Sequence, residues 1–169
     1  MAMITNNDRT VKLRSKDQEV YEVPAKAAEL SILIKTTLEF DEEDADEEAN
    51  DDIIDIPKVG SKCLSKVVEF LNHHAEKPFK KIETPFVGET MEEVVTDEWY
   101  RNFIDVERQV VFELVTAANF MDIPPLLDLA CLKSAFLING KSAEEIRLML
   151  DLPKLTPRQE AEVIFFQNI

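Results

Sequence analysis

The sequence has few of the residues on which several common kinds of site depend. Of its 169 residues, only three are glycine and two are cysteine. The glycines, Gly60, Gly88 and Gly140, are isolated from one another, which excludes a glycine-rich phosphate-binding loop. Cys63 and Cys131 lie far apart and form no CxxC pair, so we expect neither a disulfide framework nor a zinc site.

Positive charge and long apolar runs are also scarce. Lysine and arginine number 19 against 34 acidic residues, which gives a net charge of −15. Such a polyanion is repelled by nucleic-acid phosphates and by anionic lipid surfaces, so we expect neither as a partner. No apolar run approaches the roughly 18 residues that a membrane helix needs, and residues 1–14 lack the apolar core of a signal peptide. We therefore expect a soluble, intracellular protein.

The negative charge is concentrated in one segment. Residues 41–52 contain nine acids and no base, and without them the net charge would change from −15 to −6. Mutual repulsion and the lack of apolar residues predict a disordered acidic loop here. The segment does not have the spaced ligands and central glycine of an EF-hand, which disfavours a calcium site.

The first part of the chain has the patterns of strands and short helices. Apolar and polar residues alternate over 11–14 and 20–23, which is typical of a β-hairpin. Helix-spaced apolar residues predict a helix over 32–40, and three isoleucines within 53–56 predict a third strand. Ser61 is expected to cap a further helix that frays at a pair of histidines.

The rest of the chain is predicted to be helical. His73 and His74 are adjacent, and neighbouring helical side chains point about 100° apart, so they would not converge on one metal ion. We expect them to satisfy a helix C-terminus instead. Amphipathic patterns, prolines, an Asn-Gly stop and two capping boxes predict helices over 99–104, 107–120, 124–138, 142–150 and from 156 onward. Strands followed by helices indicate an α+β architecture.

Two of these helices have more apolar surface than one core can use. In the helix over 107–120, Phe120 lies opposite the apolar stripe, so it must meet another element or another protein. The helix over 124–138 is apolar on nearly every side, and Val163, Ile164, Phe165 and Phe166 follow near the end. A protein-binding surface explains this pattern. A tightly wrapped helical core with a docked tail would explain it as well.

Catalytic groups are poorly represented. Cys131 lies among leucines, and the two histidines are more than two turns from Cys63 on the same helix. The paired carboxylates lie in the acidic segment or at capped helix starts, where no rigid pocket can separate their pKa values. We therefore expect no enzymatic activity, no catalytic residue, no metal, no cofactor and no small-molecule substrate.

The order of several motifs resembles the S-phase kinase-associated protein one family. The matching segments are VKL from Val11, VYEV from Val20, IKTTLE from Ile34, IPKV from Ile56, the pair His73-His74, FELVTAANFMDIPPLLDLAC from Phe112, NGKSAEEIR from Asn139 and LTP from Leu155. The resemblance implies a BTB/POZ-type domain over 1–138 and a C-terminal helical extension for F-box binding over 139–169. It also implies a non-catalytic adaptor that links F-box proteins to a cullin scaffold in an SCF ubiquitin ligase, in the cytoplasm and nucleus.

The resemblance also assigns residues to the two partners. The family's cullin contact falls on Asn119 and Phe120. Its F-box contact falls on apolar positions of the last helices and the tail, which here are Leu127, Cys131, Ser134, Ile138, Leu150, Leu152, Val163, Phe165 and Phe166. Ser134 stands where the family usually has an aliphatic residue and Phe120 where it usually has tyrosine. These departures indicate a paralogue with an altered partner set.

Two other functions fit the same residues. A paralogue could bind F-box or related proteins outside any ligase, in which case it would not retain a cullin. An acidic chaperone for a basic client would instead depend on residues 41–52, so that deleting this segment would abolish client binding.

Overall fold

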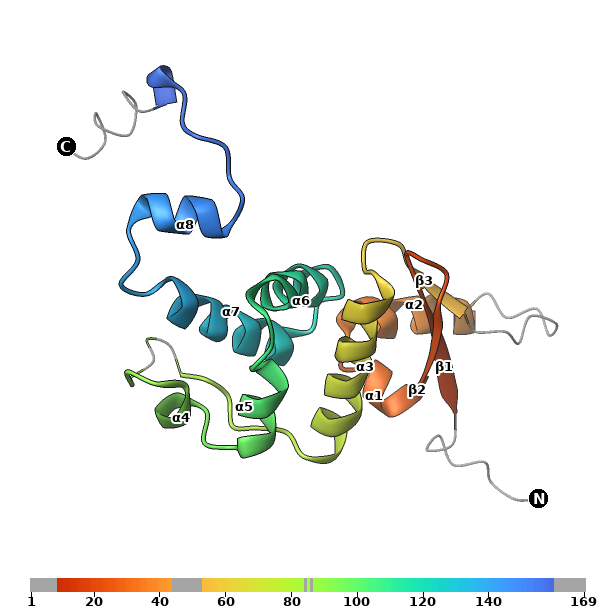
Figure 1. Cartoon of the computed structure of the whole chain (residues 1–169). Helices are drawn as coiled ribbons and strands as arrows, with labels where there is room; N and C mark the ends of the chain where they lie inside the picture. The colour runs from red at the N-terminus through yellow and green to blue at the C-terminus, as the bar shows by residue number, and fades with distance from the viewer. Residues whose placement is uncertain (1–8, 44–52, 84, 86, 160–169) are drawn as a thin grey trace, which may run out of the picture. The chain divides into compact units, whose positions relative to one another are not determined.

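A computed structural model describes residues 9–43, 53–83, 85 and 87–159 of the chain (Figure 1). The chain divides into two compact units, Met1–Leu137 and Ile138–Ile169. The first unit holds the sheet and most of the helices, and the second holds the C-terminal helical segment. Each unit is described by itself below.

The first unit contains a three-stranded sheet in the order β2-β1-β3. β1 (Thr10–Ser15) and β2 (Val20–Pro24) pair antiparallel, which confirms the predicted hairpin. β3 (Ile53–Ile56) lies parallel to β1, with Leu13 opposite Ile54. A parallel pair needs a long crossover connection, and here α1 and α2 lie in that connection.

Helices make up the rest of the first unit. They are α1 (Ala25–Ala28), α2 (Ile32–Glu43), α3 (Ser61–Glu76), α4 (Met91–Val94), α5 (Glu98–Ile104), α6 (Arg108–Phe120) and α7 (Pro124–Ile138), whose last residue begins the second unit. The predicted helices over 32–40, 99–104, 107–120 and 124–138 are all present. A small sheet with many helices confirms the α+β class.

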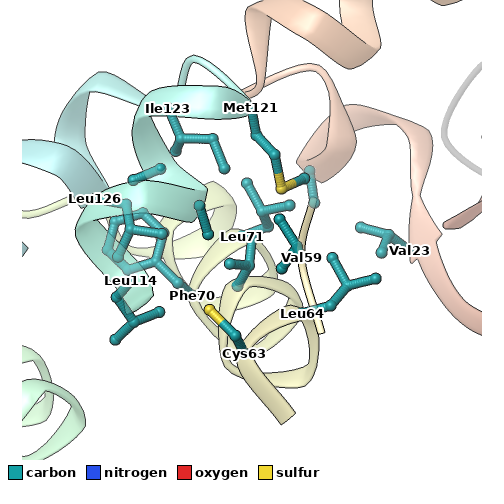
Figure 2. Close-up of a cluster of buried hydrophobic side chains, with 14 of the residues drawn as sticks. Val23, Val59, Cys63, Leu64, Phe70, Leu71, Leu114, Met121, Ile123 and Leu126 are labelled. Atoms are coloured by element: carbon teal, nitrogen blue, oxygen red, sulfur yellow. The ribbon is translucent and has the colours of Figure 1, made fainter. Parts of the chain in front are cut away.

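The core of the first unit is built around α3. Its buried residues Phe70 and Leu71 pack with Leu114 of α6 and Leu126 of α7, while Leu64 lies toward the sheet (Figure 2). All five side chains are fully buried. Burying a side chain of this size stabilises a fold by about 1.5–3 kcal/mol, so α3 is the element that joins the sheet to the later helices.

The prediction for the acidic segment is wrong at its start. α2 continues through Glu43, so residues 41–43 are helical and not part of a loop. The helix is held by its apolar residues Ile34 and Leu38, which are buried in the core. Residues 44–52 lie outside the described residues.

The start of α3 differs from the prediction in which residue caps it. The N-cap position is Gly60, and Ser61 is the first helical residue. The carboxylate of Asp17, in the turn between β1 and β2, accepts hydrogen bonds from the Ser61 backbone N–H at 2.8 Å and from the Ser61 hydroxyl. These bonds lower the pKa of the Asp17 carboxyl. A carboxylate from the hairpin thus performs the capping role expected of Ser61.

α3 continues to Glu76, so the two histidines lie in its last turn and not at a frayed end two residues earlier. Their rings belong instead to an aromatic cluster formed by Phe70, His73, His74, Phe79, Trp99, Tyr100 and Phe103. His73 stacks on Trp99 with ring centroids 3.6 Å apart, and His74 stacks on Phe70 at 5.1 Å. Stacking on Trp99 of α5 therefore places the ring of His73, and stacking on Phe70 together with a hydrogen bond to Tyr100 places the ring of His74.

A short hydrogen-bond chain runs through the aromatic cluster. The hydroxyl of Tyr100 donates to the Lys77 carbonyl at 2.6 Å, which leaves its oxygen to accept from Nδ1 of His74 at 2.9 Å. Burial, with a smaller contribution from His73, lowers the pKa of His74. Burial also raises the pKa of Tyr100 to about 12. Both groups are therefore neutral at pH 7.

The second unit begins where α7 ends. Gly140 has φ +72°, the left-handed conformation that suits glycine just past a helix. α8 (Ala143–Met149) follows, and the predicted capping box between Ser142 and Glu145 is present. Thr156 and Gln159 exchange hydrogen bonds of the same kind at the start of the next helical turn, which confirms the second predicted box.

Candidate protein-binding surfaces

The first candidate surface lies at the C-terminal end of α6. Asn119 is exposed and Phe120 is half-buried. The ammonium of Lys58, in the turn after β3, lies 5.0 Å from the centroid of the Phe120 ring, a cation–π contact. Phe120 also packs against the edge of the core. Of the two predicted alternatives, Phe120 thus meets another element of the fold, and the residue stays partly accessible to a partner.

The turn after Phe120 is fixed by the start of α2. The backbone N–H groups of Ile32 and Leu33 donate to the carbonyls of Asp122 and Met121 at 3.0 and 3.4 Å. The hydroxyl of Ser31, which is fully buried, donates to the Met121 carbonyl as well. The orphan N–H groups at a helix start are thus satisfied by the turn between α6 and α7. This pairing holds the Asn119–Phe120 surface in one geometry.

The second candidate surface is one side of α7. The buried residues of this helix are Leu126, Leu129, Ala130 and Leu132. The predicted F-box residues lie on another side, where Cys131 is exposed and Leu127, Ser134 and Ile138 are half-buried. The wrapped-core alternative therefore holds fully for one side of α7, whereas the other side is only partly covered, with Leu127 packed against the edge of the core, and stays accessible to a partner at Cys131.

Ser134 and Cys131 add little polarity to this side of α7. The Ser134 hydroxyl donates to the Ala130 carbonyl of its own helix at 2.8 Å, so its hydrogen is already used. Although the residue is exposed, partial desolvation, with a smaller contribution from Asp128, raises the pKa of the Cys131 thiol, which keeps it protonated at neutral pH. The stripe therefore presents mainly apolar atoms, although it includes a serine.

The third candidate surface is a leucine-rich segment of the second unit. Leu150 and Leu152, predicted to face an F-box protein, are 37% and 49% exposed. Leu148 and Leu155 are 61% and 49% exposed and were not predicted. A signal in the sequence could have found Leu148 and Leu155. Both lie in or after a capped helix, and no predicted element covers them. Val163, Phe165 and Phe166 lie outside the described residues.

The described residues do not bring together a metal-binding group. No set of three or more histidine, cysteine or carboxylate side chains suited to a metal occurs among residues 9–43, 53–83 and 87–159. Burial raises the pKa of Cys63 to about 11, so this thiol is protonated at neutral pH. None of the described helices is long and apolar enough to cross a membrane.

Comparison with known proteins identifies relatives over most of the chain. Residues 9–76 match the family model described as "Skp1 family, tetramerisation domain", and residues 124–164 match "Skp1 family, dimerisation domain". The first match covers the sheet and α1 to α3. The second covers α7, α8 and the chain that follows them, which includes the second and third candidate surfaces.

Individual relatives match over almost their whole length. The S-phase kinase-associated protein 1 homolog of Tetrahymena thermophila is 37% identical, over 90% of this chain and 89% of the relative. Suppressor of kinetochore protein 1 of Schizosaccharomyces pombe is 36% identical, over 90% of this chain and 92% of its own. The SCF ubiquitin ligase complex protein SKP1a of Dictyostelium discoideum is 34% identical, over 90% of both chains. With two family domains in order and relatives that match along nearly the whole sequence, this chain belongs to the Skp1 family.

Proposed function

We propose that this protein is the adaptor of an SCF ubiquitin ligase and joins an F-box substrate receptor to a cullin scaffold. The observation that carries the proposal is the open apolar side of α7, followed by exposed leucines, within a member of the Skp1 family. The name of the Dictyostelium relative describes that protein as part of an SCF ubiquitin ligase complex, which supports the same role here.

In this proposal the partners bind different surfaces. The cullin contacts Asn119 and Phe120, which the start of α2 holds in place. The F-box protein contacts Leu127, Cys131, Ser134 and Ile138 on α7, and then Leu150, Leu152, Val163, Phe165 and Phe166. The adaptor contributes no catalytic group of its own and acts by bringing two proteins together.

Reconstitution with purified proteins tests the proposal. We expect size-exclusion chromatography to recover a ternary complex of this chain, an F-box protein and a cullin N-terminal domain. Recovery of the F-box complex without the cullin would instead support a paralogue that acts outside a ligase. A variant that lacks residues 44–52 should still form the ternary complex. Loss of F-box binding in that variant would favour the acidic chaperone.

The adaptor role leads us to propose that the protein works in the cytoplasm and the nucleus, where ligases of this kind would meet their substrates. Imaging of the fluorescently tagged protein in cells tests this location. Signal confined to a membrane-bound compartment other than the nucleus would contradict it.

A further inference from the structure

α8 is a short helix whose two ends are both fastened by side chains. It has seven residues, fewer than the roughly 12–15 that a helix needs to be stable by itself in water. The described residues of α8 include no fully buried side chain that could hold it by core packing. At its start, the Ser142–Glu145 capping box satisfies two backbone N–H groups, those of Ser142 and Glu145. The stability of this segment therefore depends on polar contacts.

At the other end the backbone forms a Schellman motif. The N–H of Leu152 donates to the Arg147 carbonyl at 2.9 Å, and the N–H of Asp151 donates to the Leu148 carbonyl at 3.3 Å. This pattern requires a left-handed residue after the helix, and Asp151 supplies it with φ +53°. Glycine is the usual residue at such a position, because it carries no Cβ. Aspartate adopts this conformation less readily than glycine, so side-chain contacts that hold the turn add to its stability.

Arg147 provides those contacts. Its Nε and Nη2 atoms each donate to one carboxylate oxygen of Glu144 at 2.8 Å, in a bidentate ion pair. Its remaining terminal nitrogen, Nη1, donates to the Leu152 carbonyl at 2.6 Å. Leu152 is therefore bound to Arg147 twice, through its own N–H and through its carbonyl. The Arg147 side chain is only 19% exposed, although the helix it lies on is a surface helix.

The turn fixed in this way carries the exposed leucines. Leu148, Leu150 and Leu152 are 61%, 37% and 49% exposed, and all three lie within or beside the loop that Arg147 closes. A segment whose apolar side chains are not packed in a core normally samples many backbone conformations. Holding a binding segment in its bound conformation removes an entropic cost from association. The polar clamp keeps the leucines in one arrangement without burying them.

We propose that the Glu144–Arg147–Leu152 clamp pre-organises the leucine turn for an F-box protein, and that Arg147 is a positioning residue for this interface. The inference rests on the proposed function, since it assumes that an F-box protein is the partner of these leucines. Arg147 acts through the backbone of Leu152. The partner surface that fits is apolar, because the groups on display are leucine side chains.

Three variants separate the contacts of the clamp. R147M keeps much of the apolar stem and removes the three side-chain hydrogen bonds of Arg147. R147K keeps the charge but cannot form the bidentate pair and the carbonyl contact together. The exchange E144R/R147E restores an ion pair between the two positions, but a glutamate at position 147 cannot donate to the Leu152 carbonyl. R108M, which removes an exposed arginine at the start of α6, is the matched control.

Calorimetry with an F-box protein and amide exchange by NMR give the readouts. We expect all three variants to bind about three- to tenfold more weakly and the Leu152 amide to exchange faster in each. Cullin binding should be unchanged, and R108M should behave as the unmodified protein. E144R/R147E discriminates most sharply between the two roles of Arg147. If only the ion pair mattered, this variant would restore it and bind normally.

Any other outcome would refute either the pre-organisation, the carbonyl contact or the proposed function. Faster exchange at Leu152 with unchanged F-box affinity would refute pre-organisation, and full affinity in E144R/R147E would refute the role of the carbonyl contact. If the unmodified protein does not bind the F-box protein at all, the proposed function fails, and this inference with it. Circular dichroism of each variant verifies that the rest of the chain stays folded.

Discussion

Removing one hydroxyl group, in the variant Tyr100→Phe, should destabilise the first unit measurably. This hydroxyl donates to the Lys77 carbonyl at 2.6 Å and accepts from Nδ1 of His74 at 2.9 Å. Phenylalanine fills the same space within the aromatic cluster, so no cavity forms. The loss is therefore confined to the two hydrogen bonds.

The two lost bonds differ in cost. Lys77 is an exposed residue and its bond to Tyr100 is only partly buried, so we expect the loss at this carbonyl to be small. His74 is 9% exposed, and its Nδ1–H would be left without a partner. An unsatisfied buried donor costs about 1–3 kcal/mol, and we therefore expect Y100F to lower the free energy of unfolding by about 2 kcal/mol. For a protein of this size that corresponds to a fall in Tm of roughly 4–8 °C.

Urea unfolding followed by circular dichroism measures the effect, and Tyr21→Phe is the matched control. The Tyr21 hydroxyl makes a single hydrogen bond, to the Ser61 carbonyl at 3.0 Å, at a half-buried position. Its loss should cost about 0.5–1.5 kcal/mol. If Y100F destabilises the protein no more than Y21F, the buried imidazole does not depend on Tyr100, and the hydrogen-bond chain described above is wrong.

Three further predictions concern His74, the Asn119–Phe120 surface and the α7 stripe. Burial first, and the neighbouring imidazole second, lower the pKa of His74, so the folded protein takes up a proton at this site less readily than the unfolded chain. The contribution of neutral His74 to the free energy of unfolding should be fully present above about pH 6.5 and decrease as the pH falls toward the lowered pKa. A urea midpoint that rises when the pH is changed from 7 to 5.5 would contradict this. The double variant N119K/F120K should lose cullin binding, because removing the aromatic anchor costs about 2 kcal/mol or more of binding free energy. It should keep F-box binding and show a small fall in Tm, because Phe120 is half-buried. Unfolding of the variant would show that Phe120 is a core residue. L127E and I138E each place an unpaired carboxylate at the proposed F-box interface and should weaken F-box binding by several kcal/mol in calorimetry; full affinity in both would exclude the α7 stripe.

Local sequence patterns were enough to predict most of the helices and strands. The hairpin, α6, α7 and the capping boxes at Ser142 and Thr156 are all where periodicity and cap residues indicated. These features depend on hydrogen bonds between residues a few positions apart and on side-chain spacing, both of which can be read directly from the chain. Periodicity alone did not show which side of α7 is buried, because the helix is apolar on nearly every side.

Contacts between distant residues were decided only by the tertiary structure. Asp17 binds Ser61 across 44 positions, and Tyr100 binds His74 across 26. Neither pairing has a local signal, so the sequence alone suggested a serine cap and a helix end at the histidines. The left-handed Asp151 was missed as well, because glycine is the usual signal for this conformation and an aspartate stands at position 151. Spacing along the chain determines which elements form, whereas the partner of each polar side chain is determined by which elements pack together.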